Sequence, residues 1–462
     1  MGVEHSSRLF SKYKGLNMKD LTKGSINKVI LQFALPILLG QFIQLLYGVT
    51  DTWIIGNILG DNALAAVGSV TPIGDMIIGF LVGLTNGFAI IASRYYGAKD
   101  HDGLNKSFGG SLLFGLITSI LFTVLSVAFL PSILKVMNIA PEESAAGSAY
   151  IKVLIIGMTA SMLYNVFASI LRAIGDTIAP LIFLIISVFI NIVLVYTFVG
   201  GMHRGIQGAS EATVIAQLIS AILCFIYIYR HYPILHLTKS SFSFQSGLAK
   251  QLCACGFSMG LMSSLVSLGT LILQTSINTF STNTIIAHYA ARKLTNIFMT
   301  PFGVLAMTMA SFSSQNFGAG KYDRIRTGIK KSIFFSWIWC VIVIIISYTI
   351  VPFLIKAITS TNSEEVIHTG TLYLQVNTLL YFVTVVIVIL RNSLQGIGDN
   401  FTPIISSAIE LIGKFLTVVL LTPVLGYMGI IISEPIVWVL MVIPLIVMMR
   451  KSIVFQDFNE LD

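Results

Sequence analysis

The chain has 462 residues, of which 55% are hydrophobic and 10% are charged, and its mean hydropathy is +0.87. Soluble domains devote about a quarter of their residues to charged side chains, so this composition excludes an ordinary soluble protein and favours one that lies in lipid. Uncharged runs at 107–134, 177–203 and 332–355 each exceed the roughly 20 residues that a helix needs to cross a membrane.

The N-terminal residues 1–28 are polar and basic, and they lack the apolar core of a cleavable signal peptide. The uncharged stretch 251–291 is too long for one span, and the polar sequence FSTN at 280–283 divides it into two. The apolar windows predict twelve transmembrane helices near 30–57, 63–92, 107–132, 147–170, 178–200, 206–229, 249–280, 285–313, 331–354, 366–390, 402–423 and 428–449. The four cysteines lie in or beside apolar runs, and their spacing predicts neither a metal site nor a disulfide framework.

The distribution of basic residues predicts the orientation of these helices. One side of the membrane, which includes both termini, collects 21 of the 28 lysines and arginines, whereas the other side collects only Lys135, Lys152, Arg204 and Lys356. The positive-inside rule therefore predicts a multi-pass protein of the plasma (inner) membrane with both termini in the cytoplasm. The net charge of +8 then reflects topology. We interpret the basic cluster at 321–331 as a topogenic loop and expect no nucleic-acid partner.

Two motifs occur twice, about half a chain apart. SRYYGAKD at 93–100 resembles SQNFGAGKYD at 314–323 with a displacement of 221 residues. LRAIGDTIAP at 171–180 resembles LQGIGDNFTP at 394–403 with a displacement of 223, and Ser-Glu pairs at 210 and 433 share that displacement. In the Gly-Asp loops, Asp176 of the first and Asn400 or Thr402 of the second are predicted to cap the next helix. The nearly constant displacement indicates an internal duplication.

The duplication predicts an all-α polytopic membrane protein with twelve transmembrane helices in two parallel six-helix lobes. Because six is an even number, both lobes enter the membrane from the same side, and a cavity between them is expected to open alternately to each side. The predicted divisions are a cytoplasmic segment 1–28, an N-lobe 29–230, a cytoplasmic linker 231–248, a C-lobe 249–450 and a cytoplasmic tail 451–462.

Taken in order, four features resemble the multidrug and toxic compound extrusion (MATE) family over essentially the whole chain. They are Pro36, the stretch VTDTWIIG…LGDNALAAVG at 49–68, the paired S-x-x-x-G-A motifs at 93–98 and 314–319, and the two G-D-x-x-x-P loops. The resemblance implies a secondary antiporter, not an enzyme, that exports small amphiphilic, often cationic compounds by alternating access. It implies no cofactor other than a coupling ion, H⁺ or Na⁺. The expected partners are a small-molecule substrate and the lipid bilayer, and the protein is expected to be a monomer.

Asp51 is the first candidate for ion coupling, because ionisable side chains inside spans are costly and are functional candidates unless they are paired. By the helical rise it lies about 10 Å below the outer surface, where a carboxylate can hold a proton or Na⁺. Its position also resembles the first-helix acidic residue that the family uses for coupling. Pro36 and Gly40, upstream, weaken the same helix and form a candidate hinge. The alternative is an aspartate that simply faces water near a helix end.

Asn191 and Asp75 are the other ion-coupling candidates. One branch of the family has an aspartate four residues after the asparagine, where this chain has Val195, so the two-carboxylate proton site of that branch is incomplete here. Asn191 could instead form an interhelical hydrogen bond. Asp75 is predicted near mid-membrane, facing a wet cavity or a partner. Tyr47 and Tyr150 are predicted to line the substrate cavity of the first lobe.

The second lobe contains two candidate structural ion pairs. Arg292 and Glu434 are predicted at similar depths, and Glu410 and Lys414 are spaced to meet on one helix face. The alternative role is a substrate site, since basic groups here would admit anionic or zwitterionic cargo. In the seventh helix the only polar side chains at 265–273 are those of a serine and a threonine, so this segment has no carboxylate to bind an ion.

Other functions remain open at this point. The nearest alternative is a flippase of the same superfamily for lipid-linked precursors or polysaccharides, although such proteins commonly have fourteen spans. A membrane-embedded enzyme is a weaker alternative, because the sequence contains no HExxH, GxSxG or Walker motif. A channel is disfavoured because no filter-like repeat is present.

Overall fold

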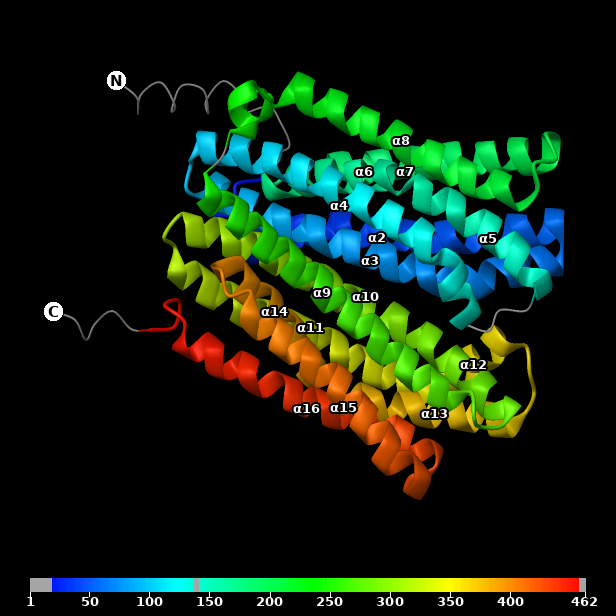
Figure 1. The fold of residues 1–462 in the computed structure, drawn as a ribbon. Coiled ribbons are helices and arrows are strands. Elements are labelled where there is room, and N and C mark those ends of the chain that lie inside the picture. The colour runs from blue at the N-terminus through cyan, green and yellow to red at the C-terminus, as the bar shows by residue number, and fades with distance from the viewer. Residues whose placement is uncertain (1–18, 137–140, 244, 457–462) are drawn as a thin grey trace, which may run out of the picture.

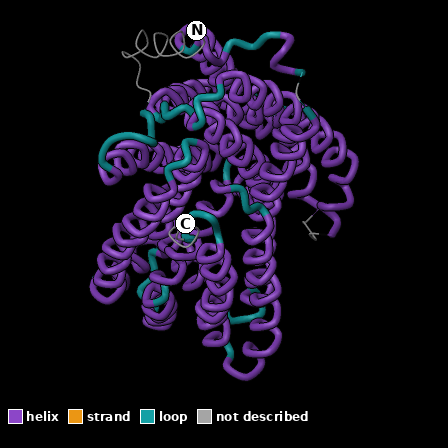
Figure 2. Tube along the Cα trace, turned by 90° about the vertical axis from the view of Figure 1, so that its left-hand side faces the viewer, coloured by secondary structure: helices purple, strands orange, loops and turns teal. Residues whose placement is uncertain are grey.

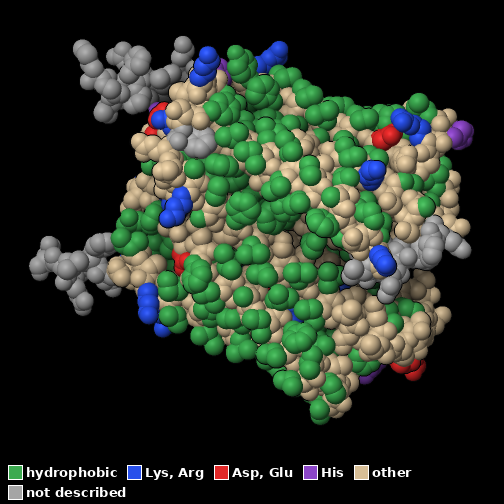
Figure 3. All heavy atoms as spheres, in the orientation of Figure 1, with side chains coloured by type: hydrophobic (Ala, Val, Ile, Leu, Met, Phe, Trp, Pro, Cys, Tyr) green, Lys and Arg blue, Asp and Glu red, His purple; other side chains and the backbone are tan. Residues whose placement is uncertain are grey.

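The computed structural model describes residues 19–136, 141–243 and 245–456, and these residues form only helices and connecting loops (Figures 1 and 2). Within them, ten helices are long and apolar enough to cross a membrane, and two bent helix pairs raise the number to twelve. The predicted terminal segments 1–28 and 451–462 lie partly outside the described residues. Hydrophobic side chains cover the middle of the face shown in Figure 3, and charged side chains lie mainly towards its two ends.

The helices follow the predicted order in both halves of the chain. The first half contains α2 (Ile26–Leu59), α3 (Asp61–Gly97), α4 (His101–Val136), α5 (Pro141–Ile156), α6 (Met158–Ala173), α7 (Ile178–Val195), the π-helical turn η1 (Tyr196–Gly201) and α8 (Gly205–His231). The linker contains the short turns η2 (Pro233–Leu235) and η3 (Lys239–Phe242). The second half contains α9 (Ser246–Ile277), α10 (Thr282–Gly318), α11 (Tyr322–Thr349), α12 (Val351–Thr359), α13 (Glu364–Leu379), α14 (Tyr381–Ile397), α15 (Phe401–Leu425) and α16 (Tyr427–Lys451).

Two of the predicted helices are sharply bent. The fourth predicted span is divided into α5 and α6 by a 45° bend at Gly157, and the tenth is divided into α13 and α14 by a 55° bend at Leu380. These break points lie 223 residues apart, which is the displacement that separates the repeated motifs. The duplication is therefore present in the shape of the helices as well as in the sequence.

The two Gly-Asp loops cap their following helices through equivalent aspartates. In the first loop Asp176 Oδ1 accepts hydrogen bonds from the backbone N–H groups of Ile178 and Ala179, at 3.1 and 3.0 Å, as predicted. In the second loop the prediction of Asn400 or Thr402 is wrong. Asp399, displaced by 223 residues from Asp176, accepts from Phe401 N–H and Thr402 N–H at 3.0 Å each.

Both described chain ends lie at one end of the helix bundle, together with the loops that follow α3, α6, α8, α10 and α14 (Figure 1). We call this end the basic side, because most lysines and arginines are predicted there, and the other end the opposite side. The two lobes approach closely near the basic side and diverge towards the opposite side (Figure 1).

Glycines bring α3 and α9 together across this lobe boundary. Gly83 and Gly87 on α3 face the backbone of α9, where a Cβ would lie 2.6 Å from Met259 O and 2.5 Å from Cys255 O, respectively. Gly256 on α9 faces the Phe88 ring of α3 in the same way. Small residues four positions apart allow two membrane helices to pack backbone against backbone. This contact fixes the separation of the lobes near the basic side.

Replacing Gly87 with alanine is expected to destabilise the protein by about 1–3 kcal/mol, because the new methyl group forces α3 away from α9. Gly79→Ala is the matched control on α3, since no atom lies within 4 Å of its added Cβ. The thermal unfolding midpoint of the purified protein in detergent measures both effects. Equal midpoints for the two variants would contradict a tight α3–α9 contact.

Candidate functional site

A polar centre in the N-lobe forms where α2, α7 and α8 meet. Asp51 lies on α2 and is half-buried, and its Oδ1 atom is shielded from solvent without a hydrogen-bond partner among the described residues. Asn191 lies on α7 and is 2% exposed, and its Oδ1 atom also lacks a partner there. This polar centre therefore holds two buried oxygen acceptors, Asp51 Oδ1 and Asn191 Oδ1, that no protein donor in the described chain satisfies.

Thr213 of α8 joins the elements of this centre. Its hydroxyl group donates to Ala209 O at 3.2 Å and accepts from Asn191 Nδ2 at 3.1 Å. The Tyr47 hydroxyl lies 3.1 Å from Thr213 Oγ1. Because the threonine proton is committed to Ala209, Tyr47 is the donor in this last contact. Tyr47 lies one helical turn before Asp51, so the hydrogen-bonded chain runs directly beside the carboxylate.

Thr213 was not predicted from the sequence. An uncharged threonine inside an apolar helix carries no signal in composition, and such side chains commonly bond only to their own helix. The nearby Ser210–Glu211 pair is part of the duplication, and Thr213 lies within one turn of it. Glu211 itself is bound at 2.9 Å by Arg204 and belongs to a separate, more exposed ion pair.

The remaining N-lobe candidates lie at different depths. Tyr150 of α5 is 9% exposed, and its hydroxyl lies within electrostatic range of Asp51, Tyr47 and Asp75. Asp75 is exposed on α3, so it belongs to the surface outside the buried centre. The structure thus joins Tyr47 and Asn191 through Thr213, with Asp51 and Tyr150 within electrostatic range of Tyr47, and it places Asp75 at the margin.

The predicted hinge lies in an unbroken helix in this conformation. α2 runs continuously through Pro36 and Gly40 from Ile26 to Leu59. A Cβ added at Gly40 would make only ordinary contacts, 3.6 Å from Leu184. Pro36 removes one backbone hydrogen bond from the helix, so bending at this point remains a prediction.

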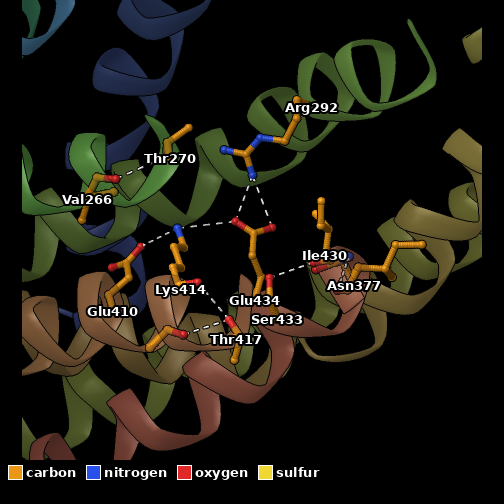
Figure 4. Close-up of polar contacts among 12 residues, drawn as sticks. Val266, Thr270, Arg292, Asn377, Glu410, Lys414, Thr417, Ile430, Ser433 and Glu434 are labelled. Atoms are coloured by element: carbon orange, nitrogen blue, oxygen red, sulfur yellow. Dashed lines mark hydrogen bonds and ion pairs between the residues drawn. The ribbon is translucent and has the colours of Figure 1, made fainter. Parts of the chain in front are cut away.

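The C-lobe contains one buried charge network in place of the two separate pairs that the sequence predicted. Arg292 Nη1 of α10 lies 3.1 Å from Glu434 Oε1 of α16, and Lys414 Nζ of α15 lies 3.0 Å from Glu410 Oε1. The pairs join because Lys414 Nζ also lies 3.5 Å from Glu434 Oε1 (Figure 4). Figure 4 shows Glu434 between Arg292 and Lys414, with Glu410 beyond the lysine.

Arg391 extends this network and was also missed. The tenth span was predicted to end at residue 390, but α14 continues to Ile397 and carries Arg391 inside the protein, where it is 6% exposed. Its Nη2 atom lies 3.7 Å from Glu410 Oε2 and donates to Ser406 Oγ at 3.1 Å. The network therefore contains three cations and two carboxylates, and its formal charge is +1.

Neighbouring uncharged residues complete the network. The Tyr373 hydroxyl donates to Glu434 Oε2 at 2.6 Å. Gly269 of α9 makes room for Lys414, since a Cβ there would lie 3.1 Å from the lysine Cδ. Breaking a buried ion pair leaves an uncompensated charge, so these contacts favour a structural role for the network.

The duplication relates the two centres to each other. Tyr150 and Tyr373 occupy equivalent positions with a displacement of 223, and so do Asn191 and Lys414. A neutral amide in the N-lobe thus replaces a cation in the C-lobe. The N-lobe centre contains a carboxylate and open oxygen acceptors, whereas the carboxylates of the C-lobe centre are paired with cations and the network has a formal charge of +1.

The chain is similar to proteins of known family. A family model described as MatE matches residues 36–197 and 259–420. The Probable multidrug resistance protein YoeA of Bacillus subtilis is 26% identical over 335 residues, which are 71% of this chain and 72% of that protein. The Probable multidrug resistance protein NorM of Thermotoga maritima is 22% identical over 398 residues, covering 84% of this chain and 83% of that protein.

Solved structures share the fold. The outward-facing conformation of a multidrug resistance MATE family transporter of the MOP superfamily matches with a TM-score of 0.87 and 21% identity, over 95% of this chain and 98% of that one. A MOP superfamily transporter from Pyrococcus furiosus, described as having a binding pocket of reverse polarity, matches with a TM-score of 0.85 and 21% identity over the same shares. At these identities the likeness shows the two-lobe fold alone.

Glu434→Gln is expected to destabilise the protein by about 3–5 kcal/mol, because it leaves Arg292 and Lys414 without their shared carboxylate. The duplication provides the matched control Glu211→Gln, whose more exposed pair with Arg204 contributes about 0–1 kcal/mol. Thermal unfolding in detergent measures the difference. If both variants unfold at the wild-type temperature, the C-lobe network does not stabilise the fold.

Proposed function

The chain belongs to the MatE family, whose members are membrane transporters and not enzymes, and we propose that it is an ion-coupled antiporter that exports small amphiphilic, cationic compounds. The names of its relatives support multidrug export as the cargo class. In this proposal H⁺ or Na⁺ is the coupling ion. The protein lies in the plasma (inner) membrane, and its basic side faces the cytoplasm. The transporter works as a monomer.

The observation that carries the proposal is the unsatisfied carboxylate of Asp51. A buried oxygen without a donor is costly, and the cost is greater in a membrane protein, where water is scarce. A bound proton neutralises the Asp51 carboxylate and gives it an O–H group that can donate a hydrogen bond, whereas a bound Na⁺ supplies positive charge to the oxygens of Asp51 and Asn191. Either ion is therefore favoured here on chemical grounds, and carboxylates in such positions serve as ion and proton sites in transporters.

The geometry suggests how the ion reaches its site. Asp51 lies eight residues before the end of α2, so it is about 12 Å from the opposite side by the helical rise. The lobes diverge on that side (Figure 1). An ion entering from the opposite side loads Asp51, and the chain Tyr47–Thr213–Asn191 transmits the change among α2, α8 and α7.

The same centre suits a cationic substrate. Tyr47, which is partly exposed, offers aromatic surface beside the negative charge of Asp51, and the buried Tyr150 lies within electrostatic range of both. Aromatic rings and carboxylates attract organic cations, and a cation that competes with the coupling ion for Asp51 is released when the ion binds. The C-lobe network has a formal charge of +1, so the carboxylate in the N-lobe centre makes that lobe the more favourable place for a cation.

Asp51→Asn is expected to lower ion-driven ethidium transport at least tenfold in proteoliposomes, because the amide cannot gain or lose the coupling charge. Asp61→Asn, at the exposed start of α3, is the matched control and is expected to transport at the wild-type rate. Separate H⁺ and Na⁺ gradients identify the ion. Normal export by inserted Asp51→Asn protein would contradict the coupling role, and the absence of dye flux under either gradient would favour the flippase alternative.

A further inference from the structure

The duplicated motifs meet each other across the lobe boundary on the basic side. Arg94 of α3 donates from Nη2 to Gly396 O of α14 at 3.2 Å. Gln315 of α10 donates from Nε2 to Ala173 O of α6 at 2.8 Å. Arg94 and Gln315 occupy the same place in the two S-x-x-x-G-A motifs, and Ala173 and Gly396 occupy the same place in the two Gly-Asp loops. Each lobe therefore offers an equivalent donor to an equivalent acceptor of the other lobe.

Close packing surrounds both of these hydrogen bonds. Gly97 lies against the Gln315 backbone and Gly318 lies against the Arg94 carbonyl oxygen, so closely that a Cβ at either glycine would overlap its neighbour. The Arg94 guanidinium also covers the Phe317 ring, 5.3 Å from its centroid. We call Arg94, Ala173, Gln315 and Gly396 the reciprocal lock.

A strap formed by residues 19–24 covers the Gln315 half of the lock. Lys19 N–H donates to Gly175 O at 3.4 Å in the N-lobe loop, and Leu21 N–H donates to Gln315 Oε1 at 3.1 Å. Gly175 has φ +93°, and a Cβ there would overlap the Lys19 carbonyl oxygen. One amide side chain thus binds both the strap and the N-lobe loop.

The C-lobe holds the far end of the strap. Arg324 donates from Nη1 to Gly24 O at 2.9 Å, and Lys321 Nζ donates to Thr22 O at 2.7 Å. Leu21 is fully buried among C-lobe side chains. The strap is therefore anchored on the C-lobe by side chains and touches the N-lobe only at its first residues.

We propose that the reciprocal lock and the strap form the gate that keeps the basic side closed. This inference rests on the proposed alternating-access function and names the contacts that must break when the transporter opens to that side. The acceptors are backbone carbonyls near helix C-termini, and each can bind water once the lobes part. Two such hydrogen bonds favour the closed over the open state by roughly ten- to hundredfold. An ion or substrate that binds the open state more tightly can overcome this preference.

Cys255 provides a reporter within the closed boundary. It is fully buried, its backbone carbonyl lies against Gly87 of α3, and its thiol lies within electrostatic range of Arg94. A background in which Cys224, Cys253 and Cys340 are replaced by alanine leaves this thiol as the sole target for a small maleimide. The labelling rate of Cys255 then measures opening without any need for transport.

Gln315→Leu and Arg94→Gln are each expected to raise the labelling rate of Cys255 at least tenfold. Exposed residues on the same side provide the matched controls Gln251→Leu and Arg230→Gln, which are expected to label at the background rate. Gln315→Leu leaves the Arg94 charge in place, so faster labelling in that variant reports exposure of the thiol. Arg94→Lys keeps a charged donor and is expected to label as slowly as the background protein. If changes at position 94 acted by unfolding the whole protein, this conservative variant would label fast as well.

The strap is tested by Gly175→Ala, which displaces Lys19 and is expected to raise labelling about threefold or more. Gly320→Ala is the matched control, because Gly320 also has a positive φ of +69° but has open space around its added Cβ. Lock variants that label no faster than background would overturn the gate. Equal rates for Gly175→Ala and Gly320→Ala would overturn the strap's part in it.

Dye transport by the parent protein, in which Cys255 is the only cysteine, separates this inference from the proposed function. If the parent exports dye but the lock variants label at the background rate, the gate is wrong and the transport function stands. If the parent exports no dye but the variants still label faster, the lock stands and the proposed cargo or coupling is wrong.

Discussion

The backbone contact between α3 and α9 determines how the rest of the molecule is arranged. Gly83 and Gly87 bring the two helices so close that the first helix of the second lobe packs into the core of the first, through Cys255 and Met259. The first helix of the N-lobe packs reciprocally, since Phe33 of α2 belongs to the C-lobe core. The lobes are interlocked near the basic side and separate towards the opposite side, which is the form that a cavity opening to one side requires.

Because the protein lies in lipid, every buried charge is energetically unfavourable unless it is compensated, and the two lobes differ in how they compensate theirs. In the C-lobe, cations from three helices pair with Glu434 and Glu410, so that the network joins the four helices α10, α14, α15 and α16. In the N-lobe, Asp51 and Asn191 each keep an oxygen without a partner among the described residues. The two duplicated centres thus differ: charged side chains pair with one another in the C-lobe, whereas the N-lobe centre keeps the unpartnered oxygens where we propose that an ion or a substrate binds.

Long apolar runs and repeated motifs were sufficient to predict twelve spans in two lobes, because both signals are local in sequence. The capping role of Asp176 followed from turn chemistry for the same reason. Thr213 was missed because its importance comes only from the helices that meet it. A charged residue at the end of an apolar run predicts the start of a loop, which is why Arg391 was not predicted to lie inside a helix. The joining of two ion pairs through Lys414 depends on how α15 and α16 pack. The sequence pattern does not predict contacts between segments that are distant in the chain.

The most direct test of alternating access is a pair of interlobe distances measured by electron–electron resonance on spin-labelled protein in lipid. Labels at Asn62 and Asn278 span the opposite side, and labels at Lys99 and Asp323 span the basic side; all four residues are exposed. As proton or Na⁺ concentration and dye are varied, the account predicts that one distance shortens while the other lengthens. Distances that stay fixed, or that lengthen together, under every condition would contradict it.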